Sequence, residues 1–152
     1  MGYNLRKRLV LLFAAALIVV IVLVYPSLGC KISGDQIKAS PVKPFVIIVR
    51  EGYAIGFTFN LTNLGGCEAT AESIQVDLRT AVHADGRVTD MHTTESESLR
   101  TALPPGQTKM FSYSLDSYLQ FRPAKLDLRI EISFGDAGRV TVFDGELPIP
   151  QK

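Results

Sequence analysis

The chain has little cysteine and no excess of basic charge. Its two cysteines, Cys30 and Cys67, are too few for a scaffold built on disulfides. Beyond Cys30 there are 13 Lys/Arg and 15 Asp/Glu, which gives a formal charge of −2. A protein that binds a phosphate backbone carries a basic face or stripe. We therefore expect no nucleic-acid partner.

Residues 31–152 also lack amphipathic helices, internal repeats and low-complexity tracts, and show alternating apolar and polar residues instead. The alternation is clearest at residues 53–62. A strand places alternate residues on one face, whereas a helix scatters them around its circumference. Burying each large side chain is worth roughly 1.5–3 kcal/mol, so this stretch is predicted to be a central core strand. Its apolar positions are Tyr53, Ile55, Phe57, Phe59 and Leu61.

Further strands are predicted at residues 36–39, 45–50, 71–82, 87–91, 98–103, 108–115, 125–134 and 139–147. Residues 93–98 are interpreted as a loop and residues 116–123 as a crossover that packs its aromatic side chains. Pro41 and Pro44 indicate a strand that is broken or lies at a sheet edge. The pattern is typical of an all-β fold, an immunoglobulin- or fibronectin-III-like antiparallel β-sandwich of about 7–8 strands.

An unbroken apolar run covers residues 9–24 and directly follows Arg6, Lys7 and Arg8. Its 16 residues lie between a signal-peptide core of about 7–15 and a membrane span of about 17 or more. The basic flank stays on the cytoplasmic side, so the rest is exported. We expect one N-terminal hydrophobic helix that contacts membrane lipid through residues 9–25, with the domain on the extracytoplasmic side of the cell membrane.

Residues 27–30 leave the fate of this leader open. The tetrapeptide Ser27-Leu28-Gly29-Cys30 resembles a lipobox, the end of a lipoprotein signal whose cysteine receives lipid. One alternative is therefore cleavage and lipidation at Cys30. The others are an uncleaved single-pass signal anchor, and full secretion. The expected organisation is a leader at 1–30, a stalk and first strand at 31–44, and a β-sandwich domain at 45–152.

The order of strands and turns resembles two known families. The matching residues are 57–65, Leu103-Pro104-Pro105-Gly106, 126–134 and Glu146-Leu147-Pro148. Over residues 36–150 this pattern resembles late-embryogenesis-abundant type 2 (LEA-2, WHy) domains and the CARDB-type adhesion modules of prokaryotes. The resemblance implies an immunoglobulin-like sandwich without catalysis, used for envelope structure, binding or stress protection.

Four residues are candidates for a copper(I) site: His83, Met91, His92 and Met110. Thioether and imidazole ligands suit that ion, and the order of His and Met resembles periplasmic copper chaperones. The competing interpretation is that all four residues occupy ordinary surface or core positions and that His83 lies in a turn. We expect no metal and no cofactor.

Two further residues are candidates for modification. Cys67 either bridges to Cys30 in an oxidising compartment or, if Cys30 carries lipid, stays a free thiol; the free thiol is the expected state. Asn60-Leu61-Thr62 matches the glycosylation sequon, but its position within a predicted strand disfavours modification.

No residue pattern predicts catalysis. Hydrolysis needs a nucleophile beside a base or two facing carboxylates, and Asp77, Asp127 and Glu131 are expected on a solvated strand face. A cluster of carboxylates lacks the spacing of a calcium loop; its members are Asp85, Asp90, Glu95 and Glu97.

We therefore expect a non-catalytic binding or structural module of the cell envelope. Its predicted partner is another protein, bound through an exposed strand edge or through the loop end of the sandwich. The candidate edge is at residues 46–49, which are unusually apolar for an unpaired strand. The alternatives are an accessory subunit of a membrane or surface-filament complex, a stress-protection protein and a periplasmic-type copper carrier.

Overall fold

The computed structural model describes residues 30–151. Contacts divide the chain into two units, residues 1–31 and 32–152, and the strands of the fold all belong to the second unit. The predicted hydrophobic helix and its lipid contact at residues 9–25 lie outside the described residues. Within residues 30–151, no helix is long and apolar enough to cross a membrane.

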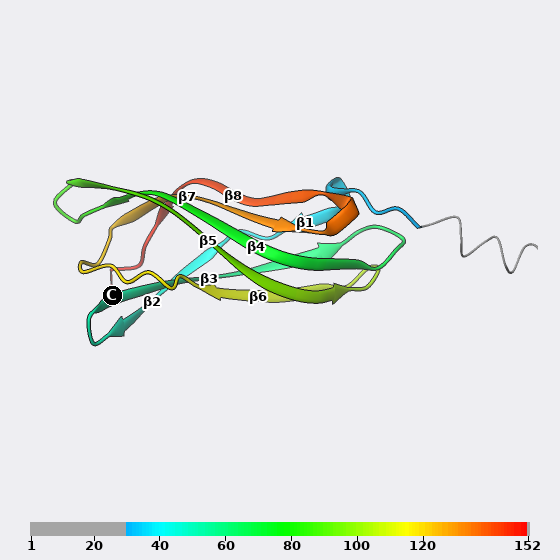
Figure 1. Ribbon diagram of the computed structural model, residues 1–152, viewed down its shortest axis with the longest axis horizontal. Helices are drawn as coiled ribbons and strands as arrows, with labels where there is room; N and C mark the ends of the chain where they lie inside the picture. Colours follow the sequence, from blue (N-terminus) through cyan, green and yellow to red (C-terminus); the bar gives the residue numbers. More distant parts are fainter. Residues whose placement is uncertain (1–29, 152) are drawn as a thin grey trace, which may run out of the picture. The chain divides into compact units, whose positions relative to one another are not determined.

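Eight strands form two antiparallel sheets (Figure 1). The strands are β1 (Ile37–Ala39), β2 (Lys43–Val49), β3 (Gly52–Asn63), β4 (Ala69–Val82), β5 (Val88–Leu103), β6 (Thr108–Ser114), β7 (Lys125–Ser133) and β8 (Arg139–Pro148). Short 3-10 turns occupy Gly34–Gln36 and Gly135–Ala137. The all-β prediction is confirmed for the described residues.

The first sheet is built around β3, the strand predicted to be central. β6 pairs along one side of β3, and β1 and β2 follow one another along the other side. Residues 40–42 separate β1 from β2, where Pro41 has no amide to donate. Ser40 bridges the break, since its N–H donates to Asn60 O (2.9 Å) and its Oγ accepts from Asn60 N (2.8 Å). The predicted break is therefore confirmed.

The second sheet has the strand order β5-β4-β7-β8. One face of each sheet is apolar, and the two apolar faces pack into a single core because each strand alternates apolar and polar residues. The core includes Ile55, Phe57, Phe59, Leu61, Ile74, Val76, Leu78, Leu126, Leu128, Ile130 and Ile132.

β5 corrects the prediction of a short strand, a loop and a weak strand over residues 87–103. It is one strand of 16 residues, so the loop predicted at residues 93–98 is wrong. Its register against β4 shifts twice, close to His92 (φ 46°) and Arg100 (φ 48°). Each shift is a bulge with one extra residue. The alternation of β5 continues across both bulges, but many of its inward-facing residues are Thr or Glu, so the sequence gives little apolar signal.

The crossover at residues 116–124 contains no strand of its own. Leu119 exchanges two backbone hydrogen bonds with Tyr53, 2.8 and 2.9 Å long, and its side chain is buried. Phe121 stacks on His83 with ring centroids 3.5 Å apart. Tyr118 is 56% exposed, so the prediction that the crossover packs all of its aromatic rings is wrong for Tyr118.

Asn63 organises the loop after β3 and the position of Cys67. Its Nδ2 donates to Cys67 O (2.6 Å) and Leu103 O (2.8 Å), and its Oδ1 accepts from Gly65 N (2.9 Å). These bonds satisfy a fully buried amide. Cys67 and Cys30 are both disulfide-bonded, so the expectation of a free thiol at Cys67 is wrong.

Candidate functional site

The candidate site is the outer edge of β2. β2 pairs with β3 along one side, and within residues 30–151 no strand pairs with its other side. The register with β3 is continuous from the pair of Lys43 with Thr58 to the pair of Val49 with Gly52. The edge is therefore a strand without a bulge.

The hydrogen bonds of β3 show which of its backbone groups face away from β2. Tyr53 exchanges both of its backbone bonds with Leu119, and Ile55 O accepts from Leu115 N (2.9 Å). Both partners lie on the β6 side. Because backbone groups alternate along a strand, the odd-numbered residues of β3 face β6 and the even-numbered residues face β2.

The same alternation fixes the backbone of β2. Ala54 lies opposite Ile47, and Gly56 lies opposite Phe45. Phe45 and Ile47 therefore direct their backbone groups toward β3. The amides and carbonyls of Val46 and Ile48 point away from the sheet and are the groups that a further strand would bind.

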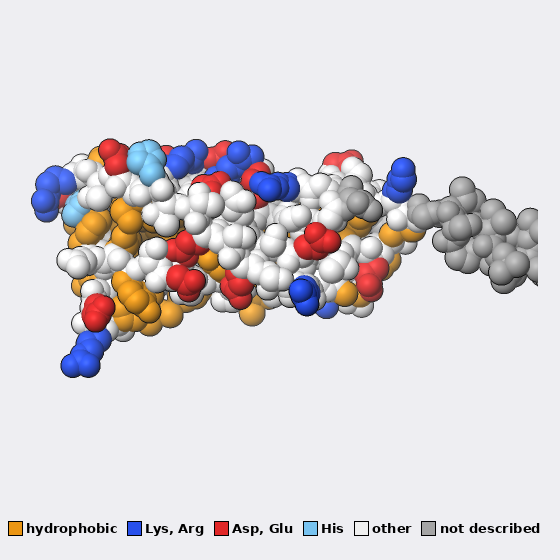
Figure 2. Space-filling view, in the orientation of Figure 1, with side chains coloured by type: hydrophobic (Ala, Val, Ile, Leu, Met, Phe, Trp, Pro, Cys, Tyr) orange, Lys and Arg blue, Asp and Glu red, His pale blue; other side chains and the backbone are white. Residues whose placement is uncertain are grey.

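The side chains of this edge are apolar. Ile48 is 76% exposed and Ile47 is 45% exposed. A methyl group at Gly56 would lie 2.1 Å from the Phe45 ring, so the ring rests directly on the Gly56 backbone and holds β2 against β3. In Figure 2, apolar side chains gather at the end of the sandwich that carries the β2–β3 hairpin, whereas charged side chains gather along β7 and β8.

The outer strands of the second sheet carry the devices that usually prevent edge-to-edge pairing. These devices are bulges, charged side chains and proline. β5 has two register shifts and several carboxylates, and β8 has a shift beside Val142 and ends at Pro148. Between Phe45 and Val49, β2 has no charge, no bulge and no proline. This edge is therefore open to a partner strand.

The turn after β2 is fixed by Gly52. Its φ is 148°, and a methyl group there would lie 2.3 Å from the carbonyl oxygen of Leu119. Only glycine allows this approach of the hairpin to the crossover.

Exposed charges flank the apolar edge, with Lys43 at its start and Arg50 and Glu51 in the turn.

Glu95 joins the two sheets on the side opposite β2. Its carboxylate accepts hydrogen bonds from Asp116 N (2.8 Å), Ser117 N (3.0 Å), Ser117 Oγ (2.6 Å) and Tyr113 Oη (3.3 Å). Partial burial alone would raise the pKa of Glu95, but the bonds from Ser117, Asp116 and Tyr113 together lower it below its usual range. Partial burial and the nearby Glu95 charge raise the pKa of Tyr113. Glu95 therefore has a structural role.

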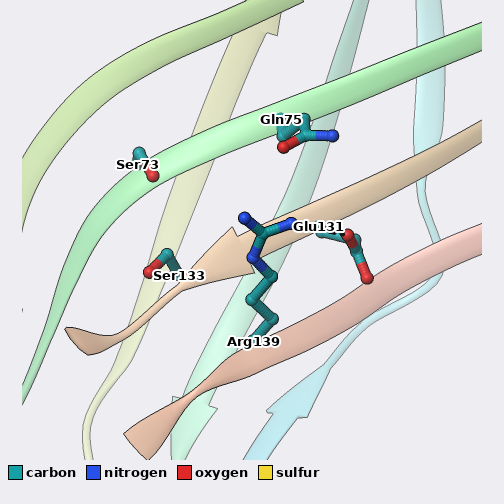
Figure 3. A pocket seen from close by; sticks show the side chains of 5 residues that line it. All are labelled: Ser73, Gln75, Glu131, Ser133 and Arg139. Carbon is teal, nitrogen blue, oxygen red and sulfur yellow. Dashed lines mark ion pairs between the residues drawn. The ribbon is translucent and has the colours of Figure 1, made fainter. Parts of the chain in front are cut away.

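Glu131 lines a shallow hollow on the outer face of the second sheet (Figure 3). Its carboxylate lies 2.7 Å from Arg129 and 3.6 Å from Arg139, which reaches across from β8. Glu131 is 9% exposed, so the prediction that it lies on a solvated face is wrong. The hollow measures about 70 Å³, far below the roughly 300 Å³ of a small-molecule site.

The four copper candidates are spread over the turn after β4, strand β5 and strand β6. His83 Nε2 is 2.9 Å from Thr89 Oγ1, and Met91 packs against the core. His92 is exposed at a bulge of β5, whereas Met110 is 73% exposed on β6 of the other sheet. Among residues 30–151, no group of three or more His, Cys, Asp or Glu side chains is arranged to hold a metal ion.

The remaining candidates have backbone or covalent partners. Asn60 is exposed within β3, opposite Met110, and its N–H bonds to Ser40. Asp85 accepts bonds from the backbone and side chain of Arg87, which lower its pKa. Cys30, the candidate for lipidation, is disulfide-bonded.

Comparison with solved structures shows the fold. The chain aligns with Northeast Structural Genomics Consortium target SoR45 with a TM-score of 0.53 and 15% identity, over 78% of this chain and 90% of that one. The putative ApaA protein from Bordetella pertussis aligns with a TM-score of 0.48 and 18% identity, over 76% of this chain and 95% of that one. The sporulation control protein Spo0M from Bacillus subtilis aligns with a TM-score of 0.42 and 12% identity, over 74% of this chain and 51% of that one. The first likeness supports a β-sandwich fold and carries no function.

Comparison with protein-family models and with curated proteins gave no match.

Proposed function

We propose that this protein is a non-catalytic β-sandwich of the cell envelope, held at the membrane by its leader, and that it binds another protein through the β2 edge. The observation that carries the proposal is the outward-facing backbone of Val46 and Ile48 beside exposed apolar side chains. An extended segment that adds to a sheet edge gains affinity from main-chain hydrogen bonds. Ile47 and Ile48 would then select its side chains.

Two observations support an extracytoplasmic location. The basic flank at residues 6–8 precedes the apolar run, an arrangement that exports the following domain. Both cysteines are disulfide-bonded, and disulfides persist in oxidising compartments.

The disulfide also favours a signal anchor over a lipoprotein. A cysteine whose sulfur is in a disulfide has no thiol left to carry lipid. The mass of the mature N-terminal peptide under non-reducing conditions tests this alternative. An intact leader supports the anchor, whereas a chain that starts with a lipid-modified Cys30 contradicts it.

The strand arrangement supports an immunoglobulin- or fibronectin-III-like module. β1, β2, β3 and β6 form one sheet, β5, β4, β7 and β8 form the other, and the fourth and fifth strands pair as a hairpin at one side. Within this class, a LEA-2-like protective role predicts that the protein preserves a test enzyme through drying. A CARDB-like or accessory-subunit role predicts a stoichiometric protein partner. The open β2 edge favours such a role over a protective one.

The proposal is tested by recovering tagged full-length protein from its native membranes in mild detergent. We expect wild type to retain a stoichiometric protein, and Ile48→Lys to lose it because a charge at an open edge opposes strand pairing. Val88→Lys is the matched control, since Val88 is also exposed (61%) but lies on β5. Equal recovery from wild type and Ile48→Lys, or no associated protein at all, contradicts the proposal.

A further inference from the structure

We infer that Asn60 is an acceptor for an N-linked glycan on the exported domain. The inference does not depend on the binding edge, but it rests on the extracytoplasmic location that the proposed function also assumes. Asn60-Leu61-Thr62 is the one match to the Asn-x-Ser/Thr sequon in the whole sequence. Three observations carry the inference: the freedom of the Asn60 side chain, the surface around it, and the partner of Thr62.

The side chain of Asn60 takes no part in the hydrogen bonds of the sheet. Its backbone N–H donates to Ser40 Oγ (2.8 Å), and its carbonyl accepts from Ser40 N (2.9 Å). Asn60 is exposed, and no group within residues 30–151 bonds to its carboxamide. Its position within a strand therefore fixes the backbone and leaves the side-chain nitrogen available.

Small polar side chains surround Asn60 on the outer face of the first sheet. β3 and β6 present alternate residues to that face, and these residues lie opposite one another in the register. From residue 58 to residue 62 and along β6, none of them is charged; they are Thr58, Asn60, Thr62, Thr108, Met110, Ser112 and Ser114. An open hollow of about 130 Å³ lies beside Asn60, and its lining includes Ser40, Lys43 and Met110. A sugar on Asn60 therefore has space, and it has hydroxyl groups to bond.

Thr62 supplies the hydroxyl group that completes the sequon. In the folded domain its Oγ1 lies 2.8 Å from Oγ1 of Thr108 on β6. The backbone of Asn60 and the hydroxyl of Thr62 are thus both hydrogen-bonded once the sheet has formed. Because a transferase meets these groups free only before that point, we place the transfer on the chain as it is exported.

The co-reactant is an oligosaccharide joined through its anomeric carbon to a lipid pyrophosphate. Nδ2 of Asn60 forms a bond to that carbon while the bond from the carbon to the pyrophosphate oxygen breaks. The lipid pyrophosphate leaves with the electron pair, and a base of the transferase takes one proton from Nδ2. The product carries a bulky, soluble group on the outer face of the first sheet.

Mass spectrometry of the full-length protein from its native membranes tests the inference. After reduction, cleavage at Arg50 and Arg79 gives a peptide of residues 51–79, which contains Asn60. We expect this peptide to be heavier than its sequence mass and to release sugar fragments. Asn60→Gln should abolish the added mass. A wild-type peptide that has only its sequence mass overturns the inference.

Matched variants separate the sequon from the hydroxyl contact. Thr62→Ser keeps the sequon and should keep the sugar, whereas Thr62→Val should lose it. Thr108→Val removes the same contact between hydroxyl groups but leaves the sequon intact, so it should keep the sugar. Sugar that persists in Thr62→Val, or is lost in Thr108→Val, contradicts recognition of the sequon and overturns the inference.

Labelling of Lys43, which is exposed, separates this inference from the proposed function. The reagent is a membrane-impermeant amine label, applied to cells whose cytoplasmic membrane is intact. If Asn60 is bare and Lys43 is labelled, the domain is exported and the glycan alone is wrong. If Asn60 is bare and Lys43 stays unlabelled, the extracytoplasmic location is wrong, and both proposals fail.

Discussion

A single carboxylate, Glu95, connects β5 to the segment that follows β6. Three residues direct four donors at it, and hydrogen bonds to a charged group are each worth about 1.5–3 kcal/mol. We expect Glu95→Gln to lower the free energy of unfolding by roughly 1–3 kcal/mol at neutral pH. Urea denaturation measures this change. Glu97→Gln, at an exposed site two residues away, is the control and should change stability little.

The effect of Glu95 should depend on pH. Because its pKa is lowered in the folded state, the stabilisation is complete above the unfolded pKa of about 4.3 and is lost as the pH falls through the folded pKa. The stability difference between wild type and Glu95→Gln should therefore shrink below about pH 4. A difference that stays constant down to about pH 2 would show that the carboxylate charge has no part in it.

Gly52 is expected to tolerate no side chain. Gly52→Ala adds a methyl group 2.3 Å from Leu119 O at a φ of 148°, and strained backbone of this kind costs about 1–3 kcal/mol. Thermal unfolding should show a lower Tm. Gly145→Ala is a matched control because Gly145 has a similar φ, 138°, with open space around it. If both variants lose the same stability, the contact with the crossover contributes nothing.

At the scale of the strands, the bulges of β5 hold non-glycine residues in a left-handed conformation. Arg100 has a φ of 48°, which costs an ordinary residue roughly 1–2 kcal/mol. We expect Arg100→Gly to stabilise the fold by about 0.5–1 kcal/mol, measured by denaturant unfolding. Thr101→Gly, one residue further along the strand, should destabilise it by a similar amount. A loss of stability in Arg100→Gly would show that its side chain makes a contact worth more than the strain.

The sequence predicted strands well wherever alternation runs unbroken. In β3 and β7 every second residue is large and apolar, and both strands lie where predicted. The division of β5 into two strands and a loop is wrong because many residues on its inward face are Thr or Glu. An exposed edge strand with a polar sequence gives little apolar alternation from which the strand can be predicted.

The candidate site was predictable in part. The apolar residues 46–49 and the flanking prolines indicated an open edge, and the structure places β2 there. Two contacts were not predictable. The sequence places Glu95 only in a carboxylate cluster without calcium-loop spacing, because its hydrogen-bond donors lie about 20 residues away in sequence. Glu131 alternates like a solvated residue, but Arg129 and Arg139 cover it.

At the scale of the whole molecule, the outer face of the second sheet is charged, whereas the β2 edge of the first sheet is apolar. The outer face of the second sheet is linked by ion pairs between Arg79, Asp127 and Asp144, with nitrogen–oxygen distances of 2.6 and 2.7 Å. Such exposed pairs contribute little to stability but keep that face hydrated. The β2 edge has no comparable charge between Phe45 and Val49, so association of this domain should depend on β2.

Hydrogen–deuterium exchange of single backbone amides is the most direct test of that claim. In the assembled full-length protein, the amides of Val46 and Ile48 should exchange slowly, and the Ile48→Lys variant should release them to fast exchange. The amides of Phe45 and Ile47, which face β3, should stay slow in both proteins. If Val46 and Ile48 exchange as fast in assembled wild type as in the variant, the β2 edge binds no partner and the account is wrong.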